Sequence, residues 1–161
     1  MSVNYPIRRF LIEIDMDGRI VLSTGRAEEI IGYSYRELKG KNIIDLVFPD
    51  DVDDFRKQLN DVISRKASFE NIETRILDKY GKVLYVNVSG VFIKTVDPPL
   101  YQLTFADITE RVIADFDLKK SRDEAELYLD LITHDIANLN QIGMGYLEIA
   151  LESKNIDDPE R

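Results

Sequence analysis

A long run without proline constrains this sequence more than any other feature. Residues 108–153 hold no proline, and apolar side chains recur there at the three- and four-residue steps of a helix. The apolar positions are Leu118, Ala125, Tyr128, Ile132, Ile136, Leu139, Tyr146 and Ala150. The pattern predicts one helix, which at about 1.5 Å per residue would be roughly 65 to 70 Å long. One globular domain cannot cover that length, so we expect a helical dimer or a four-helix bundle.

The apolar repeat changes where the only histidine of the chain lies. A four-residue step from Ile132 to Ile136 follows another four-residue step, which is the pattern of a stutter. His134 stands two residues from each isoleucine and therefore lies off the apolar stripe. Asn138 and Gln141 follow it at positions i+4 and i+7, so the three side chains predict a polar, solvent-facing row.

His134 also has a distinctive chemistry, because a neutral imidazole is a nucleophile at neutral pH. The neighbouring carboxylate of Asp135 can accept a proton from one ring nitrogen and leave the other free to attack a phosphoryl group. Spacing alone favours a simpler interpretation, in which a solvated helix face includes one histidine. Residue types by themselves therefore leave both interpretations open.

The chain before this helix predicts a domain of class α+β. Residues 10–14 and 20–22 alternate apolar and polar side chains around Asp17-Gly18, which indicates a hairpin. Short helices with Ala27, Ile30, Ile31 and Leu38 inward are expected next, then a longer helix after Pro49 that buries Val52, Phe55, Leu59 and Val62 or Ile63. Three further strands are predicted at residues 69–77, 83–93 and 100–106. This order gives a five-stranded antiparallel sheet with short helices on one face, followed by one long C-terminal helix.

Four carboxylates gather around the start of the longer predicted helix, at Asp50, Asp51, Asp53 and Asp54. Carboxylates bind hard cations, but a calcium loop needs ligands at alternating positions and a distal bidentate Glu. Acids at a helix N-terminus already have a role in capping and in meeting the helix dipole. We therefore expect no metal site.

Composition excludes several classes of function. The net charge of -9 argues against binding nucleic acid or an anionic membrane surface. No cysteine is present, which excludes disulfides, thiolate catalysis and cysteine-bound metals. No apolar run approaches the roughly 20 residues of a membrane span, and residues 1–9 lack a signal-peptide core. A cytoplasmic protein is expected.

Several phrases resemble the PAS sensor family over about residues 6–111. They are Gly32-Tyr33-Ser34, Glu37-Leu38-Lys39-Gly40-Lys41, Phe48-Pro49-Asp50-Asp51 and Asp107-Ile108-Thr109-Glu110-Arg111. The resemblance implies a pocket between sheet and helices that can hold a non-covalent ligand. Haem and a covalent flavin are improbable, because family members attach them through histidine or cysteine. Two alternating sets could line the pocket, although core packing is the favoured role: Ile72, Thr74 and Ile76, and Tyr101, Leu103 and Phe105.

Residues 134–138 resemble the phosphoacceptor box of sensor histidine kinases, and the similarity covers roughly residues 120–153. The resemblance implies that His134 accepts the γ-phosphoryl group of ATP, that Asp135 acts as general base, and that Asn138 positions a water that dephosphorylates a partner. The common form of the box has Glu and a following proline, whereas this chain has Asp135 and no proline.

Together the resemblances predict three parts. Residues 6–108 form a PAS sensor domain, residues 109–130 a coiled-coil linker, and residues 131–161 a phosphoacceptor helix cut off before its second helix and the ATP-binding domain. A loop is expected at residues 155–159. The chain would be the sensor and phosphoacceptor portion of a two-component histidine kinase, inactive alone, without a cofactor of its own, with ATP serving the parent kinase.

The expected partners are a second copy of the chain, the ATP-binding domain of the parent kinase and the receiver domain of a response regulator. Two alternatives remain: a non-catalytic PAS module that dimerises, and a ligand or flavin sensor whose output is not phosphorylation. The sensed signal and the direction of the helices in the dimer stay open.

The junction at Asp107 predicts how the two parts are joined. Asp107 can cap the long helix with Glu110 three residues on, in a capping box that leaves no slack after the last strand. A rigid junction suits transmission, because a shift in the sheet would then rotate or bend the helix.

Overall fold

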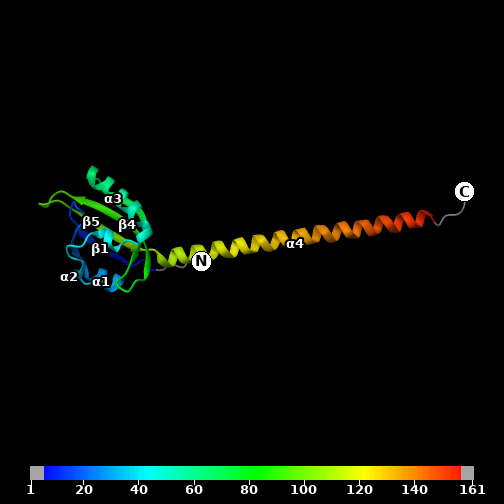
Figure 1. Cartoon of the computed structure of the whole chain (residues 1–161), viewed down its shortest axis with the longest axis horizontal. Coiled ribbons are helices and arrows are strands. Elements are labelled where there is room, and N and C mark those ends of the chain that lie inside the picture. Colours follow the sequence, from blue (N-terminus) through cyan, green and yellow to red (C-terminus); the bar gives the residue numbers. More distant parts are fainter. Residues whose placement is uncertain (1–5, 157–161) are drawn as a thin grey trace. The chain divides into compact units, whose positions relative to one another are not determined.

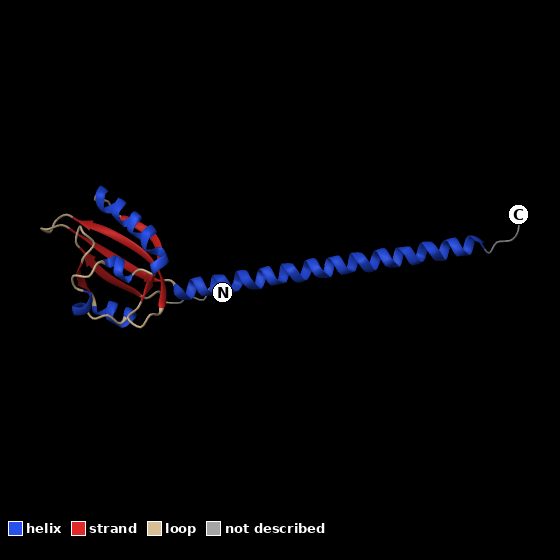
Figure 2. Ribbon diagram, in the orientation of Figure 1, coloured by secondary structure: helices blue, strands red, loops and turns tan. Residues whose placement is uncertain are grey.

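The computed structural model describes residues 6–156 and contains every predicted strand and helix of the N-terminal part (Figures 1 and 2). The elements are β1 (Arg9–Ile14), β2 (Ile20–Ser23), α1 (Gly25–Ile31), α2 (Tyr35–Leu38), η1 (Ile43–Leu46), η2 (Pro49–Asp51), α3 (Val52–Arg65), β3 (Phe69–Leu77), β4 (Val83–Ile93), β5 (Leu100–Asp107) and α4 (Thr109–Ile156). The chain divides into two compact units between Ile113 and Ala114. The predicted loop at residues 155–159 starts too early, since α4 extends through Ile156, and the remainder lies outside the described residues.

The five strands form one antiparallel sheet in the order β2-β1-β5-β4-β3, drawn in red in Figure 2. β1 lies beside β5, so that Ile12 is opposite Leu103. Alternate residues of β1, β4 and β5 are buried, which confirms the period-two pattern of the sequence for these strands. β2 departs from the prediction: Ile20 and Ser23 are buried but Leu22 is exposed, because an irregularity in the pairing with β1 shifts the register there. The fold is therefore α+β, with one apolar face of the sheet turned toward the helices.

The helices supply the other half of the core. α1 buries Ala27 and Ile31, α2 buries Leu38, and α3 buries Phe55, Leu59 and Val62. Of the two alternatives at the end of α3, Val62 is buried and Ile63 is half-buried. Most of these side chains pack in one cluster with the inner residues of the sheet. The short helices therefore all lie on the same face of the sheet.

α2 is fixed to the turn between β3 and β4 by an ion pair. Ser34 and Glu37 form a capping box, and the carboxylate of Glu37 also lies 2.6 Å from the Lys79 ammonium. The hydrogen bond from Lys79, followed by that from the Ser34 backbone, lowers the pKa of Glu37 to about 2. The carboxylate therefore stays ionised at any ordinary pH.

The carboxylates at the start of α3 bind protein groups. Asp51 accepts hydrogen bonds from Arg75 Nε (2.8 Å) and from the Arg75 backbone N–H (3.1 Å), and the guanidinium lies over the ring of Phe48. The side-chain hydrogen bond from Arg75 holds the pKa of Asp51 below its usual range. Within residues 6–156, no group of His, Cys, Asp and Glu side chains is arranged to bind a metal ion. Across the same range, no helix combines the length and apolarity of a membrane span.

Close packing inside the sheet gives a stability prediction at Gly90. A Cβ atom at this position would overlap Phe69 Cε1 and meet Leu103 Cδ2 at 2.9 Å. We expect Gly90→Ala to lower the free energy of unfolding by about 1–3 kcal/mol, because it overpacks the inner face. Urea denaturation followed by tyrosine fluorescence measures this change. Gly25→Ala is the matched control, since a Cβ there meets nothing within 4 Å; equal losses in both variants would contradict the packing argument.

Candidate functional site

α4 is one uninterrupted helix, as its sequence predicts. It runs over 48 residues from Thr109 to Ile156 and is therefore about 70 Å long. Its large apolar side chains are exposed, from 53% for Leu131 to 72% for Tyr146. A single chain thus leaves the apolar positions of α4 in water, which is unfavourable for so much apolar surface.

The apolar surface of α4 is broad in its second half. At about 100° per residue, the apolar side chains of residues 127–151 spread over more than half of the circumference, which exceeds the narrow seam of a two-stranded coiled coil. A narrow polar strip remains, formed by Asp130, His134, Asn138, Gln141 and Glu148. His134 lies near the middle of this strip.

The three predicted site residues come together on one turn of α4. His134 Nδ1 lies 3.2 Å from Asn138 Nδ2 and 3.5 Å from Asp135 Oδ1. The side chains of His134 and Asp135 are 72% and 78% exposed. Both contacts are made at Nδ1, and no described residue forms a hydrogen bond with Nε2. Nε2 is therefore accessible to a reactant from solvent.

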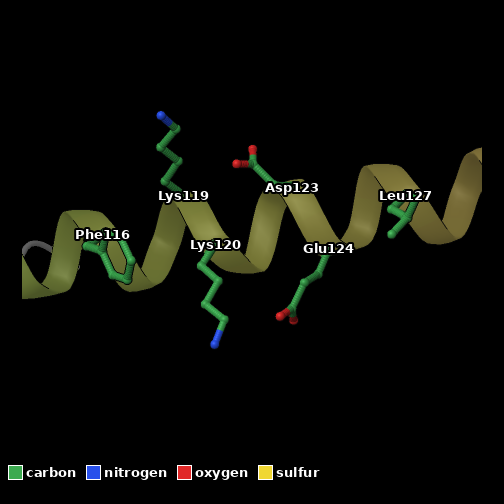
Figure 3. A pocket seen from close by; sticks show the side chains of 6 residues that line it. All are labelled: Phe116, Lys119, Lys120, Asp123, Glu124 and Leu127. Atoms are coloured by element: carbon green, nitrogen blue, oxygen red, sulfur yellow. The ribbon is translucent and has the colours of Figure 1, made fainter.

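Six side chains of α4 line a shallow hollow farther toward its N-terminus. They are Phe116, Lys119, Lys120, Asp123, Glu124 and Leu127. Figure 3 shows that all six come from one helix, with Lys119 and Asp123 on one side and Lys120 and Glu124 on the other. Two turns of a single helix cannot enclose a small molecule, so this hollow is not a candidate ligand site.

The end of β5 and the start of α4 are joined by a hydrogen-bonded cluster around Asp107. Its carboxylate accepts hydrogen bonds from the Thr109 hydroxyl (2.6 Å), the Thr109 backbone N–H (3.1 Å) and Arg8 (2.6 Å). The side chain is only 7% exposed. Burial alone would raise the pKa of Asp107, but the hydrogen bonds from Thr109 and Arg8 outweigh it and hold the pKa below the usual range.

The predicted capping box at this junction is wrong in one half. Asp107 does bind the first turn of α4, but its backbone N–H donates to the carbonyl oxygen of Arg8 (2.8 Å) instead of to Glu110. The Arg8 carbonyl thus takes the place of Glu110. β4 adds two separate contacts: the Ile108 N–H donates to the Tyr85 carbonyl (2.8 Å), and the Tyr85 N–H donates to the Thr109 hydroxyl (3.0 Å). The first turn of α4 is thus bound to a central strand.

The two alternating sets predicted on β3 and β5 are buried. They are Ile72, Thr74 and Ile76, and Tyr101, Leu103 and Phe105. Tyr101 donates a hydrogen bond from its hydroxyl to the Val62 carbonyl (3.0 Å), so its polar end is satisfied. The hydroxyl of Thr74 is buried without a hydrogen-bond partner among the described residues, and so is that of Ser23. Sequence reasoning missed Ser23, although its position opposite Ile12 in the hairpin was the available signal.

Comparison with protein families gives a match to the family described as PAS fold, over residues 20–118. A comparison with curated protein sequences gives no match. Among solved structures, the chain is similar to the PAS domain of the RpfR quorum-sensing receptor of Cronobacter turicensis. In complex with BDSF, that domain shows 19% identity and a TM-score of 0.55, with 66% of this chain and 100% of that chain covered.

Two further solved structures share the fold. The RpfR domain in complex with C12:0 gives 20% identity and a TM-score of 0.54, over 66% of this chain and 100% of that chain. The PAS domain of a protein from Colwellia psychrerythraea gives 20% identity and a TM-score of 0.55, over 63% of this chain and 87% of that chain. At these identities the likeness concerns the fold.

The junction cluster predicts a pH-dependent loss of stability in Asp107→Asn. Because the pKa of Asp107 is lowered in the folded chain, its carboxylate stabilises the fold above about pH 3.9, the value for an unfolded Asp, and this contribution is lost as the pH falls further. We expect the variant to lose about 1 kcal/mol at pH 7 and less near pH 3. Urea denaturation at both pH values measures the difference.

Asp115→Asn is the control for this prediction, because Asp115 is an exposed side chain of α4. Its unfolding free energy should change little at either pH. A deficit in Asp107→Asn that stays constant as the pH falls would contradict the assigned role of the carboxylate.

Proposed function

Because this chain belongs to the PAS fold family, we propose that residues 6–108 are a sensor domain that controls a phosphoacceptor histidine, His134, on the helix that follows. In this proposal residues 109–130 are the linker, residues 131–161 carry the phosphoacceptor, and the chain is the sensor and phosphoacceptor portion of a two-component histidine kinase. The observation that carries the proposal is the contact of His134 Nδ1 with Asp135 and Asn138, with Nε2 directed to no described neighbour.

The chemistry follows from this contact. The lone pair of Nε2 attacks the γ-phosphorus of ATP, the Nε2–P bond forms, and the P–O bond to ADP breaks with its electron pair leaving on ADP. The ring then carries a positive charge, and the Nδ1 proton passes to the carboxylate of Asp135, the general base. Asn138, one turn away, positions water when a phosphorylated partner is dephosphorylated. This step uses ATP held by the ATP-binding domain of the parent kinase.

The junction around Asp107 supports a path from sensor to linker. Tyr85 in β4 forms hydrogen bonds with both Ile108 and Thr109, so the first turn of α4 follows any shift of that strand. The helix is continuous through Ile113 and Ala114, where the two units meet. A displaced strand would therefore act on the helix without an intervening loop.

The exposed apolar surface of α4 supports a second copy of the chain as partner, and its breadth supports a four-helix arrangement with a further helix from each copy. The polar strip with His134 then stays accessible to the ATP-binding domain and to the receiver domain of a response regulator. No haem or covalent flavin is expected, because the one histidine lies on α4 and the sequence has no cysteine. We infer a cytoplasmic setting from the class of protein.

Phosphorylation of His134 is the direct test. The protein that carries this chain, with the ATP-binding domain that the proposal requires, is incubated with γ-labelled ATP. We expect a phosphate that is labile in acid and stable in alkali, as is typical of phosphohistidine. It should be lost in His134→Gln and kept in Asn140→Ala, which changes an exposed amide about 120° around the same helix from His134.

The isolated chain should incorporate no phosphate from ATP, because no phosphate-binding glycine loop is found in its sequence. Label that persists in His134→Gln would contradict the proposal. A well-folded native protein that never acquires acid-labile phosphate would contradict it as well, and would favour a PAS module that dimerises without catalysis.

A second candidate function, the binding of a small apolar ligand, is favoured by the unpartnered hydroxyl of Thr74. It is buried on the inner face of β3, opposite Val86 and between Ile72 and Ile76. A ligand with an apolar body and one polar group would satisfy such a hydroxyl. The RpfR PAS domain, which shares the fold, is in complex with BDSF and with C12:0.

Thr74→Val tests this candidate. Without ligand, we expect the unfolding free energy to rise by about 1 kcal/mol, because the variant removes a buried hydroxyl that lacks a partner. Native mass spectrometry of the purified protein should show a bound molecule that the variant loses. Thr104→Val, on the half-buried outer side of β5, should change neither quantity. A variant that is less stable than the parent would contradict the assignment.

A further inference from the structure

Asn138 and Asp135 make opposite demands on the same nitrogen of His134. A neutral imidazole carries its proton on one nitrogen and a lone pair on the other. Asn138 Nδ2 is a donor 3.2 Å from His134 Nδ1, so this contact requires a lone pair on Nδ1 and a proton on Nε2. The Asp135 carboxylate only accepts hydrogen bonds, so its contact requires the proton on Nδ1.

The two tautomers differ in reactivity. A histidine with its proton on Nε2 has no lone pair there, and the attack on phosphorus that was described above cannot start from Nε2. A histidine with its proton on Nδ1 has the lone pair on Nε2 and can react. Whichever neighbour engages Nδ1 therefore decides whether the accessible nitrogen is a nucleophile.

The distances favour Asn138. Its 3.2 Å contact is within hydrogen-bond range, whereas the 3.5 Å between Nδ1 and Asp135 Oδ1 exceeds it. The Asp135 side chain is 78% exposed, so water competes for its oxygens. The positions on the helix also differ, because i+4 stacks Asn138 directly over His134, while i+1 points Asp135 to the side.

We propose, on the basis of the phosphoacceptor function above, that Asn138 is a positioning residue that holds His134 in the tautomer protonated at Nε2 and so restrains the forward phosphoryl transfer. Asp135 opposes it by stabilising the reactive tautomer. This role is separate from placing water for dephosphorylation. A change that moves Asn138 away from Nδ1, such as a small rotation of the helix within its bundle, would release the restraint.

The chain is well suited to a direct measurement because it has a single histidine. The nitrogen chemical shifts of one imidazole report its tautomer without any assignment of signals. The purified chain is labelled with 15N and measured at about pH 8.5, where histidine side chains are neutral. We expect the Nε2-protonated form to dominate in the parent.

Four variants then separate the effects of Asn138 and Asp135 on the tautomer of His134. Asn138→Ala should shift the tautomer ratio toward the Nδ1-protonated form by about two- to fivefold, the size of one exposed neutral hydrogen bond. Asn138→Asp keeps the shape but lacks the donor and should shift it at least as far. Asp135→Asn should shift the ratio the opposite way. Asn140→Ala removes an exposed amide that forms no hydrogen bond with His134 in the described part of the chain, and it should leave the ratio unchanged.

Initial rates of autophosphorylation give the functional readout. With the ATP-binding domain present, Asn138→Ala and Asn138→Asp should phosphorylate about two- to fivefold faster than the parent. A parent that is mainly protonated at Nδ1, or an Asn138→Ala variant with an unchanged ratio, would overturn the inference even if His134 is phosphorylated. Absence of phosphate on His134 in every variant would refute the phosphoacceptor function instead, whatever the tautomer.

Discussion

The burial of one face of the sheet is the constraint on which the N-terminal unit depends. Residues of β1, β4 and β5 alternate between the two faces, so that Ile12, Leu103 and Val88 point to the same side and need a cover. α1, α2 and α3 provide it with Ala27, Leu38 and Phe55. Because β1 lies beside β5, the central strand, the end of β5 leaves the sheet close to Arg8. Arg8 binds Asp107 there, immediately before α4 begins.

The start of α4 is set by a local sequence signal together with tertiary contacts. The acid at Asp107 marks a helix start, and it does bind the first turn through Thr109. The backbone N–H of Asp107 is bound by the Arg8 carbonyl, and Tyr85 binds Ile108 and Thr109; a sequence pattern of four residues cannot include either contact. The result joins the helix to a strand in the middle of the sheet, and this makes the junction suitable for carrying a change in the sensor domain to the linker.

The His134 site was predictable because a helix places residues by sequence spacing alone. A residue at i+4 is a neighbour in any helix, so the proximity of Asn138 follows once α4 forms. The atoms in contact could not be predicted, since rotamers decide that both neighbours meet Nδ1 and that Nε2 is left without one. The buried hydroxyl of Thr74 was also predicted to face the core, but its lack of a partner depends on what packs opposite.

Neighbouring residues encode which segments are strands and helices and which side of most of them is apolar, because these properties have periods of two and 3.6 residues. The strand order β2-β1-β5-β4-β3 and the contacts between distant strands follow from the packing of the whole domain and are not encoded locally. An apolar face on a strand requires that this face be covered, but it does not specify which other strand pairs with that strand. The pairs Asp51–Arg75 and Arg8–Asp107 join residues far apart in the chain, so their distances exist only after the whole domain has packed.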